Sequence, residues 1–177
     1  MGIIASKLRT LFGAGNHKLV IIGLDNAGKT TILYKLMMDE VVETTPTIGS
    51  NVEEVRFRNL KFLVWDVGGQ DALRTTWSTY YCDTKAVILV IDSSDQGRLH
   101  IAKRELHRML QDENTHDAPV LIYANKQDMP QSLTATQISN LLGLVEIKDR
   151  PWHIQACSAI KGDGLIEGMA WVADQIR

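Results

Sequence analysis

A glycine-framed loop at residues 23–30 matches the pattern G-x-x-x-x-G-K-[ST] and limits the possible folds more than any other segment. An apolar, strand-like run at Lys18–Ile22 precedes it, and apolar residues at helical spacing follow within Thr30–Met38. Glycines let the backbone turn so tightly that successive N–H groups face one phosphate chain, and the helix start adds its positive end. The sequence therefore predicts a strand–loop–helix unit that binds the phosphates of a nucleotide.

Two side chains of this loop are expected to act directly on the ligand. Lys29 should reach the β- and γ-phosphates, and the Thr30 hydroxyl should ligate Mg²⁺. The residues predicted to line the phosphate chain are Gly23, Leu24, Asp25, Asn26, Ala27, Gly28, Lys29, Thr30 and Thr31. The loop alone leaves open whether the base is adenine or guanine, and whether the protein is a kinase, an ATPase or a switch.

Short apolar runs alternate with helical patterns along the rest of the chain. The predicted strands are Lys18–Ile22, Asn51–Phe57, Phe62–Trp65, Ala86–Ile91, Val120–Ala124 and Trp152–Ala156, and the predicted helices are Thr30–Met38, Leu99–Leu110, Thr134–Leu142 and Leu165–Ile176. This alternation predicts an α/β fold with a mostly parallel sheet and helices on both faces. A length of 177 residues suits one domain, and ligands of such sheets bind at the carboxyl ends of the strands.

Composition excludes several classes of protein. Nineteen Lys and Arg residues against 21 Asp and Glu rule out a chain-wide basic coat, so we expect no nucleic-acid partner. The longest apolar runs, Leu19–Leu24 and Ala86–Ile91, are far shorter than the roughly 20 residues that span a bilayer. Cys82 and Cys157 are too few for a disulfide framework, which favours a reducing compartment such as the cytoplasm.

A polar loop at residues 125–128 is expected to choose the base. It follows the Val120–Ala124 strand, so it should lie at the ligand-binding edge of the sheet. The Asp128 carboxylate can accept two hydrogen bonds from guanine, whereas adenine offers neither donor and would leave the carboxylate unpaired. We expect Asn125 to tie this loop to the phosphate loop and Lys126 to lay its methylenes along the base.

Residues after the last predicted strand complete the expected base pocket. Ser158 and Ala159 follow the Trp152–Ala156 strand, and the Ala159 backbone N–H is placed to donate to the guanine carbonyl. The sequence therefore predicts a guanine nucleotide, GTP or GDP, as the ligand.

Two further loops are expected to detect a third phosphate. Asp66 follows the Phe62–Trp65 strand and is placed to hold Mg²⁺ through water, while the Gly69 N–H can bond the γ-phosphate. Gln70 can orient the attacking water and is the predicted catalytic residue. Thr47, upstream, can close on Mg²⁺ when the γ-phosphate is present, which makes Thr30, Thr47 and Asp66 the predicted metal ligands.

Two other functions are alternatives to a GTP-hydrolysing switch. A small phosphate-loop kinase or ATPase would need an acceptor site and an arginine-rich lid, and the sequence offers neither. A scaffold whose hydrolysis is incidental would not need Gln70 and Thr47 where they stand. The sequence therefore favours a switch that hydrolyses GTP to GDP and phosphate.

Taken together, these motifs resemble the Arf and Arf-like small GTPases over essentially the whole chain. The matching runs are Gly23–Thr30, Pro46–Gly49, Trp65–Gln70, Asn125–Asp128 and Trp152–Gly164. Residues 50–54 and 152–156 are most similar to the Arf-like protein five subgroup. The resemblance implies the small GTPase fold, with a six-stranded, mostly parallel sheet, and a switch whose two strands within Asn51–Trp65 slide between states.

The resemblance also implies partners. These are an exchange factor, a GTPase-activating protein and effectors, for a protein that is itself a monomer. Effectors of the family face an apolar cluster at the positions of Ser50, Trp65 and Tyr80, where Arfs usually carry phenylalanine in place of Ser50. Because no arginine is evident beside the transferring phosphate, we expect slow unassisted hydrolysis that a partner's arginine accelerates. A trafficking role on Golgi or trans-Golgi membranes is what the resemblance implies.

The N-terminal residues carry a lipidation pattern. Residues 1–6 fit M-G-x-x-x-[ST], so Gly2 is predicted to be myristoylated after removal of Met1. Ile4, Leu8, Leu11 and Phe12 would form one apolar helical face. One myristoyl chain anchors only weakly, so this face would supply the second membrane contact. We therefore predict an N-terminal amphipathic helix and linker at residues 1–16 and a GTP-binding domain at residues 17–177.

Overall fold

Six strands form one sheet in the order β2-β3-β1-β4-β5-β6. The computed structural model describes residues 16–38, 47–58 and 60–176, so the predicted N-terminal helix and Gly2 lie outside the described residues. The strands are β1 (Asn16–Ile22), β2 (Ser50–Phe57), β3 (Leu60–Val67), β4 (Ala86–Asp92), β5 (Val120–Asn125) and β6 (Trp152–Ala156). Neighbouring strands run parallel except β2 and β3, which pair antiparallel. The predicted α/β class and mostly parallel sheet are confirmed.

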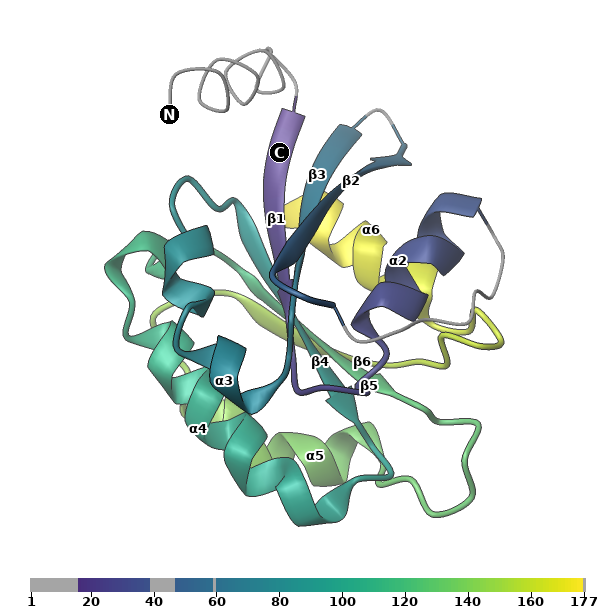
Figure 1. Ribbon diagram of the computed structural model, residues 1–177. Coiled ribbons are helices and arrows are strands. Elements are labelled where there is room, and N and C mark those ends of the chain that lie inside the picture. The colour runs from purple at the N-terminus through teal and green to yellow at the C-terminus, as the bar shows by residue number, and fades with distance from the viewer. Residues whose placement is uncertain (1–15, 39–46, 59, 177) are drawn as a thin grey trace.

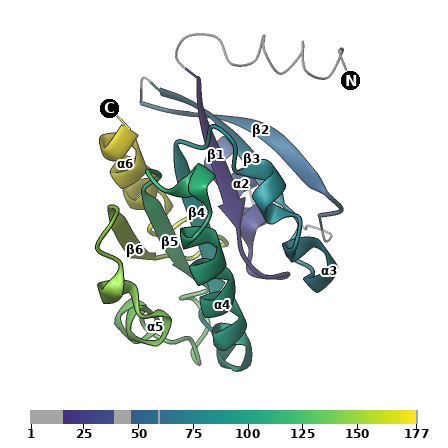
Figure 2. The ribbon, with the colours of Figure 1, turned by 90° about the vertical axis from the view of Figure 1, so that its left-hand side faces the viewer.

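Helices cover both faces of the sheet. They are α2 (Lys29–Met38), α3 (Asp71–Arg74), α4 (Leu99–Leu110), α5 (Ala135–Leu142) and α6 (Leu165–Ile176). Figure 1 shows α2 and α6 together on one side of the sheet and α3, α4 and α5 on the other, and Figure 2 looks onto the sheet from the side that α4 covers. Four 3₁₀ turns also occur in the described residues: η1 (Trp77–Tyr80), η2 (Gln96–Arg98), η3 (Glu113–Thr115) and η4 (Leu144–Glu146).

The central strands supply side chains to two separate apolar cores. In β1, Val20 and Ile22 join the core beneath α4 and α5, while Leu19 and Ile21 join the core beneath α2 and α6. This division follows from the two-residue period of a strand, which sends neighbouring side chains to opposite faces. The continuous apolar runs in β1, β4 and β5 therefore reflect burial on both faces.

Element boundaries agree closely with the sequence prediction, and the differences have local causes. The predicted Leu99–Leu110, Trp152–Ala156 and Leu165–Ile176 elements are found unchanged. The capping box at α5 is present, because the Thr134 hydroxyl accepts from the Gln137 N–H and the Gln137 side chain accepts from the Thr134 N–H. β1 begins at Asn16, two residues before the predicted strand, so it includes the last residue of the predicted N-terminal linker.

The short elements α3 and η1 were not predicted. They lie between β3 and β4, where each spans only four residues and shows no repeated apolar spacing. Their buried residues, Arg74 and Trp77, hold them by bonds to the segment that follows β3 rather than by helical periodicity.

The parallel arrangement brings several distant segments to one edge. β1, β3, β4, β5 and β6 all point the same way, so the residues that follow them lie side by side at the carboxyl edge of the sheet.

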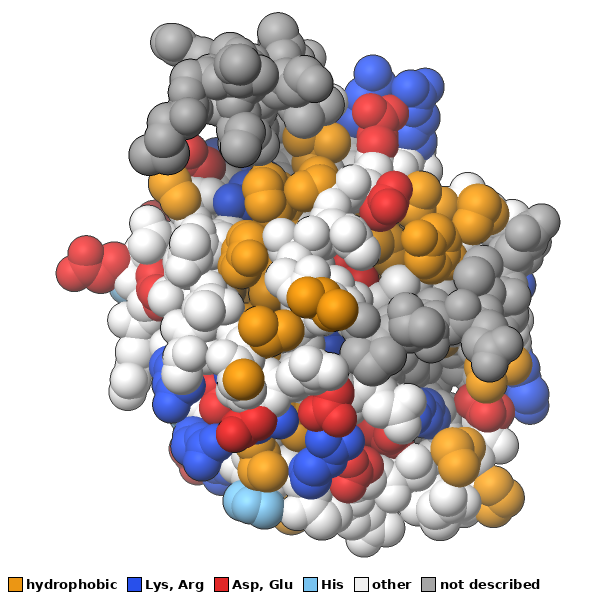
Figure 3. All heavy atoms as spheres, viewed as in Figure 1, with side chains coloured by type: hydrophobic (Ala, Val, Ile, Leu, Met, Phe, Trp, Pro, Cys, Tyr) orange, Lys and Arg blue, Asp and Glu red, His pale blue; other side chains and the backbone are white. Residues whose placement is uncertain are grey.

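Acidic and basic side chains are interspersed over the lower part of the face drawn in Figure 3. Within the described residues, no helix combines the length and apolarity needed to cross a membrane.

Candidate nucleotide-binding site

A cavity of about 410 Å³ opens at the carboxyl edge of the sheet. This volume falls within the range of small-molecule sites. Its lining comes from five segments: Asp25, Asn26, Gly28, Lys29, Thr30 and Thr31; Thr47; Gly69 and Gln70; Asn125, Lys126, Asp128 and Met129; and Ala159 and Ile160. The other predicted residues, Gly23, Leu24, Ala27, Asp66 and Ser158, are buried directly beside these lining residues. Met129 and Ile160 were not predicted, although each follows a predicted residue.

The phosphate loop is tightly turned and leaves no room for added side chains at its glycines. Gly28 has a φ of +97°, and a Cβ there would come within 2.4 Å of Asn125 Nδ2. Lys29 lies buried across the loop, where its Nζ donates to the carbonyls of Gly23 and Leu24 at 2.8 and 3.0 Å. The Lys29 ammonium therefore lies beside the backbone of the phosphate loop, at the wall of the cavity.

Burial shifts the pKa of the Lys29 ammonium. Loss of water around the ammonium lowers the pKa of Lys29 to about 8, and the nearby carboxylates of Asp66 and Asp25 limit the fall. An anionic phosphate in the cavity would oppose this shift, because it favours the charged form.

Three oxygen-bearing side chains converge beside Lys29. The Thr30 hydroxyl donates to Asp66 Oδ2, and the Thr47 hydroxyl lies 3.2 Å from the Thr30 hydroxyl and 3.4 Å from Asp66 Oδ2. Asp66 Oδ1 is buried without a hydrogen-bond partner, and burial raises the pKa of Asp66. An unpaired buried carboxylate oxygen beside two hydroxyls fits a hard cation such as Mg²⁺, which takes oxygen ligands and retains several waters.

No group of three His, Cys, Asp or Glu side chains able to hold a metal occurs in the parts of the chain that the structure describes. The cation that these residues fit would therefore complete its shell with water and phosphate oxygens, as Mg²⁺ does in nucleotide sites.

The segment after β3 lies directly against the phosphate loop. The Gly69 carbonyl accepts from the Asp25 N–H at 3.1 Å, and a Cβ on Gly69 would come within 2.3 Å of the Gly23 carbonyl. The neighbouring Gly68 carbonyl accepts from the Trp77 indole N–H at 2.9 Å. Because a peptide group is planar, this bond also fixes the direction of the Gly69 N–H. Gln70 follows with an exposed side chain at the cavity wall.

The base end of the cavity is built around Asn125, which is buried at the end of β5. Its Nδ2 donates to the Ala27 carbonyl at 2.9 Å, so the side chain ties this loop to the phosphate loop. Asp128 Oδ1 accepts from the buried Ser158 hydroxyl at 2.8 Å, which fixes the orientation of the carboxylate. The Lys126 ammonium pairs with Asp92 Oδ2 at 2.7 Å, which anchors the stem of Lys126 at the cavity wall.

One predicted donor is already engaged. The Ala159 N–H, expected to be free for the guanine carbonyl, donates instead to Asn125 Oδ1 at 3.0 Å. Ala159 still lines the cavity, so a base carbonyl there would share this N–H with Asn125. The sequence could not foresee this competition, because it depends on how β5 and β6 bring Asn125 and Ala159 together.

The predicted effector positions share one face of the sheet. Val52 pairs with Trp65 and Ser50 with Val67 in the antiparallel β2–β3 register, so all four side chains point to the same side. The Trp65 and Tyr80 rings lie 5.9 Å apart between centroids. The structure thus brings Ser50, Trp65 and Tyr80 to one side, with Val52 among them and 38% exposed.

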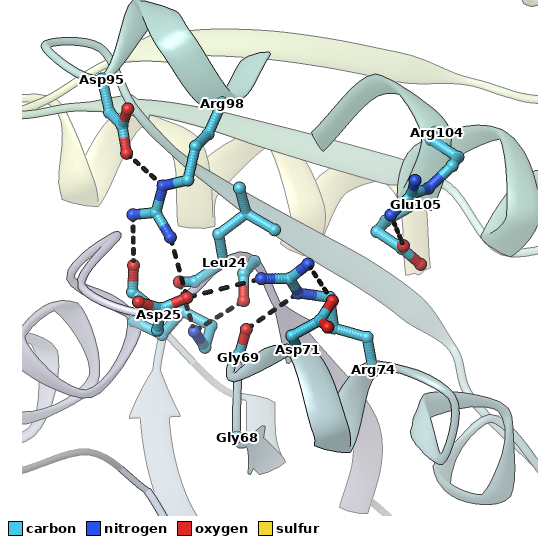
Figure 4. A network of polar contacts seen from close by, with 12 residues as sticks. Leu24, Asp25, Gly68, Gly69, Asp71, Arg74, Asp95, Arg98, Arg104 and Glu105 are labelled. Carbon is cyan, nitrogen blue, oxygen red and sulfur yellow. Dashed lines mark hydrogen bonds and ion pairs between the residues drawn. The ribbon is translucent and has the colours of Figure 1, made fainter. Parts of the chain in front are cut away.

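Two arginines not predicted to belong to the site reach the phosphate loop. Arg98 donates to Asp25 Oδ1 at 2.9 Å, and Arg74 lies 3.5 Å from the same oxygen (Figure 4). Both guanidinium groups are held by the Asp25 carboxylate, so neither is free beside the expected phosphates. No sequence pattern marks them, because Arg98 only precedes the α4 helix and Arg74 lies in the short α3.

The geometry is matched by comparison with known proteins. Residues 4–176 match the ADP-ribosylation factor (Arf) family. The chain belongs to the Arf family. It is therefore a small GTPase, and the predicted resemblance is confirmed.

Individual relatives agree with this assignment. The chain is 50% identical over 177 residues to ADP-ribosylation factor-like protein 5A of Homo sapiens, covering all of this chain and 99% of the relative. It is 52% identical over 176 residues to ADP-ribosylation factor-like protein 1 of Saccharomyces cerevisiae (strain ATCC 204508 / S288c), covering 99% of this chain and 96% of the relative. The predicted likeness to Arf-like protein five is confirmed, and the yeast protein is similar to the same degree.

The fold also matches a solved small GTPase. The Arl6 BBS3 small GTPase from Trypanosoma brucei, solved with the bound nucleotide analogue GppNp, superposes with a TM-score of 0.85 at 36% identity. The match covers 91% of this chain and 97% of that chain. The protein is therefore an Arf-family small GTPase that acts as a guanine-nucleotide switch.

Proposed function

We propose that this protein is a membrane-associated GTP switch in vesicle trafficking, acting at Golgi or trans-Golgi membranes. The observation that carries the proposal is that one cavity is lined by the Asp128 carboxylate, the phosphate loop and Gly69 with Gln70, the segment expected to meet the third phosphate. The relatives named as Arf-like proteins and the lipidation pattern at Gly2 support its membrane setting.

The nucleotide would lie across the cavity with its base at Asp128 and its phosphates at Lys29. Asp128 would accept from the two guanine donors while Ser158 holds the carboxylate in place. Lys29 and the loop N–H groups would neutralise the phosphates. Mg²⁺, held by Thr30, Thr47 and Asp66, would supply positive charge that offsets charge developing on the phosphate oxygens.

Gly69 and Gln70 would carry out the roles that hydrolysis requires. The Gly69 N–H would bond the γ-phosphate, and the Gln70 side chain would orient a water for attack on the γ-phosphorus, with GDP as the leaving group and phosphate as the second product. Arg74 and Arg98 are engaged by Asp25, so unassisted turnover should be slow, and a GTPase-activating protein would add an arginine.

Replacement of the catalytic candidate tests this mechanism. Gln70→Leu should bind GTP and stall hydrolysis, because leucine cannot hydrogen-bond the attacking water. Single-turnover hydrolysis by the purified protein, with and without an activating protein, measures the effect. Unchanged single-turnover rates would remove Gln70 from the mechanism, and full-speed hydrolysis by the unassisted wild type would remove the need for a partner arginine.

Membrane binding would depend on the N-terminus and on the nucleotide. The myristoyl group on Gly2 gives weak anchoring alone, so exposure of the apolar helical face in the GTP state would strengthen it. Sedimentation of the myristoylated protein with phosphatidylcholine vesicles, loaded with GDP or a non-hydrolysable GTP analogue, tests this coupling. Equal sedimentation in both states, or an unmodified N-terminus by mass spectrometry of protein from eukaryotic cells, counts against it.

Effectors would bind the surface formed by Ser50, Val52, Trp65 and Tyr80. Ser50 is small and polar where Arfs usually carry phenylalanine, so this surface would select partners that differ from common Arf effectors. Affinity capture with the Gln70→Leu form, compared with a Gln70→Leu/Tyr80→Ala form, identifies partners that depend on this surface. Capture of the same proteins by both forms would place effector binding elsewhere.

A further inference from the structure

Asp25 joins three segments that are far apart in the sequence. It is the third residue of the phosphate loop, and its backbone N–H donates to the Gly69 carbonyl after β3. Its carboxylate accepts from Arg98, which precedes α4, and pairs with Arg74 of α3 (Figure 4). The Asp25 carbonyl accepts from Arg98 Nη2 at 3.1 Å, so one guanidinium bonds both the side chain and the backbone of Asp25.

A carboxylate at this place presents an electrostatic problem for a triphosphate. Asp25 lines the cavity together with Lys29 and Gly69, where the third phosphate is expected. The γ-phosphate adds negative charge that GDP lacks, so an unneutralised carboxylate nearby would disfavour GTP more than GDP. The Asp25 side chain is 40% exposed, which leaves it able to turn unless something holds it.

Arg74 and Arg98 neutralise the Asp25 carboxylate and also restrain its orientation. Arg98 is held in turn by Asp95, whose Oδ2 lies 2.6 Å from Arg98 Nε. Arg74 is 6% exposed and bonds Asp71 Oδ1 at 2.9 Å. Each guanidinium is therefore fixed on one side by its own carboxylate and faces Asp25 on the other, as Figure 4 shows.

The same contacts reach the backbone that meets the γ-phosphate. Arg74 Nε donates to the Gly69 carbonyl at 3.1 Å, and that carbonyl also accepts the Asp25 N–H. Because the Gly69 carbonyl and the Gln70 N–H share one planar peptide, these two bonds set the orientation of the backbone entering Gln70. Displacement of Asp25 would therefore disturb the Gly69–Gln70 segment as well as the local charge.

We propose that Arg98 and Arg74 are positioning residues that determine the preference for GTP over GDP by holding the Asp25 carboxylate away from the γ-phosphate. The proposal rests on the proposed contact between Gly69 and the third phosphate. The arginines act through Asp25 and do not touch the nucleotide, which distinguishes this role from that of an arginine that stabilises the transferring phosphate directly.

The test replaces Arg98, which is 32% exposed and so less able than the buried Arg74 to disrupt folding. Affinities for GDP and for GppNp are measured by competition with a fluorescent guanine nucleotide. Arg98→Gln should weaken GppNp binding about tenfold more than GDP binding, the size expected of one partly screened charge. If Arg98→Gln does not fold, Arg98→Lys tests the restraint alone, because lysine keeps the charge but lacks the two-pronged contact with Asp25; it should still weaken GppNp binding more than GDP binding, by less than tenfold, and an unchanged ratio would overturn the inference.

A double variant separates action through Asp25 from direct attraction to the phosphate. Asp25→Asn/Arg98→Gln removes both charges and should return the GDP-to-GppNp affinity ratio to within about twofold of wild type. Arg104→Gln is the matched control, since Arg104 pairs with Glu105 on α4 at 3.4 Å and lies apart from the Asp25 cluster in Figure 4.

The outcomes divide clearly. An unchanged ratio in Arg98→Gln overturns the inference, and so does a double variant that remains as weak for GppNp as the single one, because Arg98 would then act on the phosphate directly. A wild-type protein that binds neither GDP nor GppNp contradicts the proposed nucleotide site itself, which is a different failure.

Discussion

Among the residues that the structure describes, Asp128 is oriented by Ser158, whose buried hydroxyl donates to Asp128 Oδ1 and leaves the other carboxylate oxygen for a ligand. Ser158 itself is fixed by the Lys161 N–H, which donates to its hydroxyl at 3.2 Å. A carboxylate held in this way can accept from two neighbouring donors on one edge of a base. Base selectivity is therefore expected to reside in one side chain.

Replacement of this carboxylate should exchange one base for another. Asp128→Asn turns an acceptor-only group into one with an amide donor, so GDP affinity should fall by about a hundredfold or more while xanthosine diphosphate gains affinity. Calorimetric titration with both nucleotides measures the exchange. Asp117→Asn, the same change on a fully exposed side chain, is the control, and a GDP affinity that survives Asp128→Asn would contradict base selection by this residue.

Lys29 should make nucleotide binding depend on pH. Burial lowers the pKa of Lys29 to about 8 in the nucleotide-free protein, and bound phosphate should raise it. Binding should therefore take up protons from about pH 7.5 upward, and affinity should fall as pH rises past about 8 until the raised pKa of the complex is reached. Calorimetry in buffers of different ionisation enthalpy measures the uptake. Lys29→Arg should abolish it, whereas zero uptake by the wild type would contradict a neutralising lysine at this site.

At the scale of elements, η1 supports the backbone that is expected to meet the third phosphate. Trp77 is 2% exposed and its indole N–H donates to the Gly68 carbonyl, which fixes the peptide that carries the Gly69 N–H. The four-residue turn η1 thus sets the direction of the Gly69 N–H. Three elements, α2, β2 and β3, separate Gly69 from the phosphate loop in the sequence. Its contribution depends on one hydrogen bond.

Removal of that hydrogen bond should weaken the triphosphate complex selectively. Trp77→Phe keeps an aromatic ring but leaves the buried Gly68 carbonyl unpaired, so GppNp affinity should fall about threefold to tenfold with GDP affinity unchanged. Unfolding free energy should drop by about 1–3 kcal/mol. Trp171→Phe, a partly buried indole stacked on His153, is the control. Equal losses for GDP and GppNp would mean that Trp77 supports the site only generally.

The elements that sequence analysis found and missed differ in what stabilises them. β4 and β5 were predicted because burial on both faces makes them continuously apolar, and α4 because one apolar stripe faces the sheet. α3 and η1 were missed because Arg74 and Trp77 hold them through bonds to glycine carbonyls, which leave no periodic trace.

The candidate site likewise has features that the sequence predicted and features that it could not predict. Its loops were predicted because each follows a strand and carries a distinctive chemical pattern. The contacts between loops, such as Arg98 with Asp25 and Asn125 with Ala159, could not be predicted because they depend on the order of the strands in the sheet.

At the scale of the whole molecule, one cavity lies where five parallel strands end. Five segments from distant parts of the sequence line it: those that follow β1, β3, β5 and β6, and the one that precedes β2. A ligand that fills the cavity contacts all of these loops at once. Its binding energy therefore adds to the stability of the folded chain.

Nucleotide should raise the unfolding temperature in a base-specific way. At about a thousandfold excess over its dissociation constant, GDP with Mg²⁺ should add about 4 kcal/mol to the unfolding free energy. Scanning calorimetry with GDP, ADP and GDP plus EDTA measures the contribution. ADP should give no shift, and EDTA should reduce the GDP effect by removing the cation from Thr30 and Asp66. A shift from ADP equal to that from GDP would favour an ATP-dependent protein instead.

Asn125 shows how far these functions are merged. The Asn125 side-chain amide donates to the Ala27 carbonyl and accepts from the Ala159 N–H. This one side chain therefore tethers the base end of the cavity to the phosphate loop. Cutting that tether would slacken two regions of the pocket at once, and the measured penalty would mix lost architecture with lost affinity. Loss of nucleotide in an Asn125 variant would therefore reveal little about which base the pocket reads.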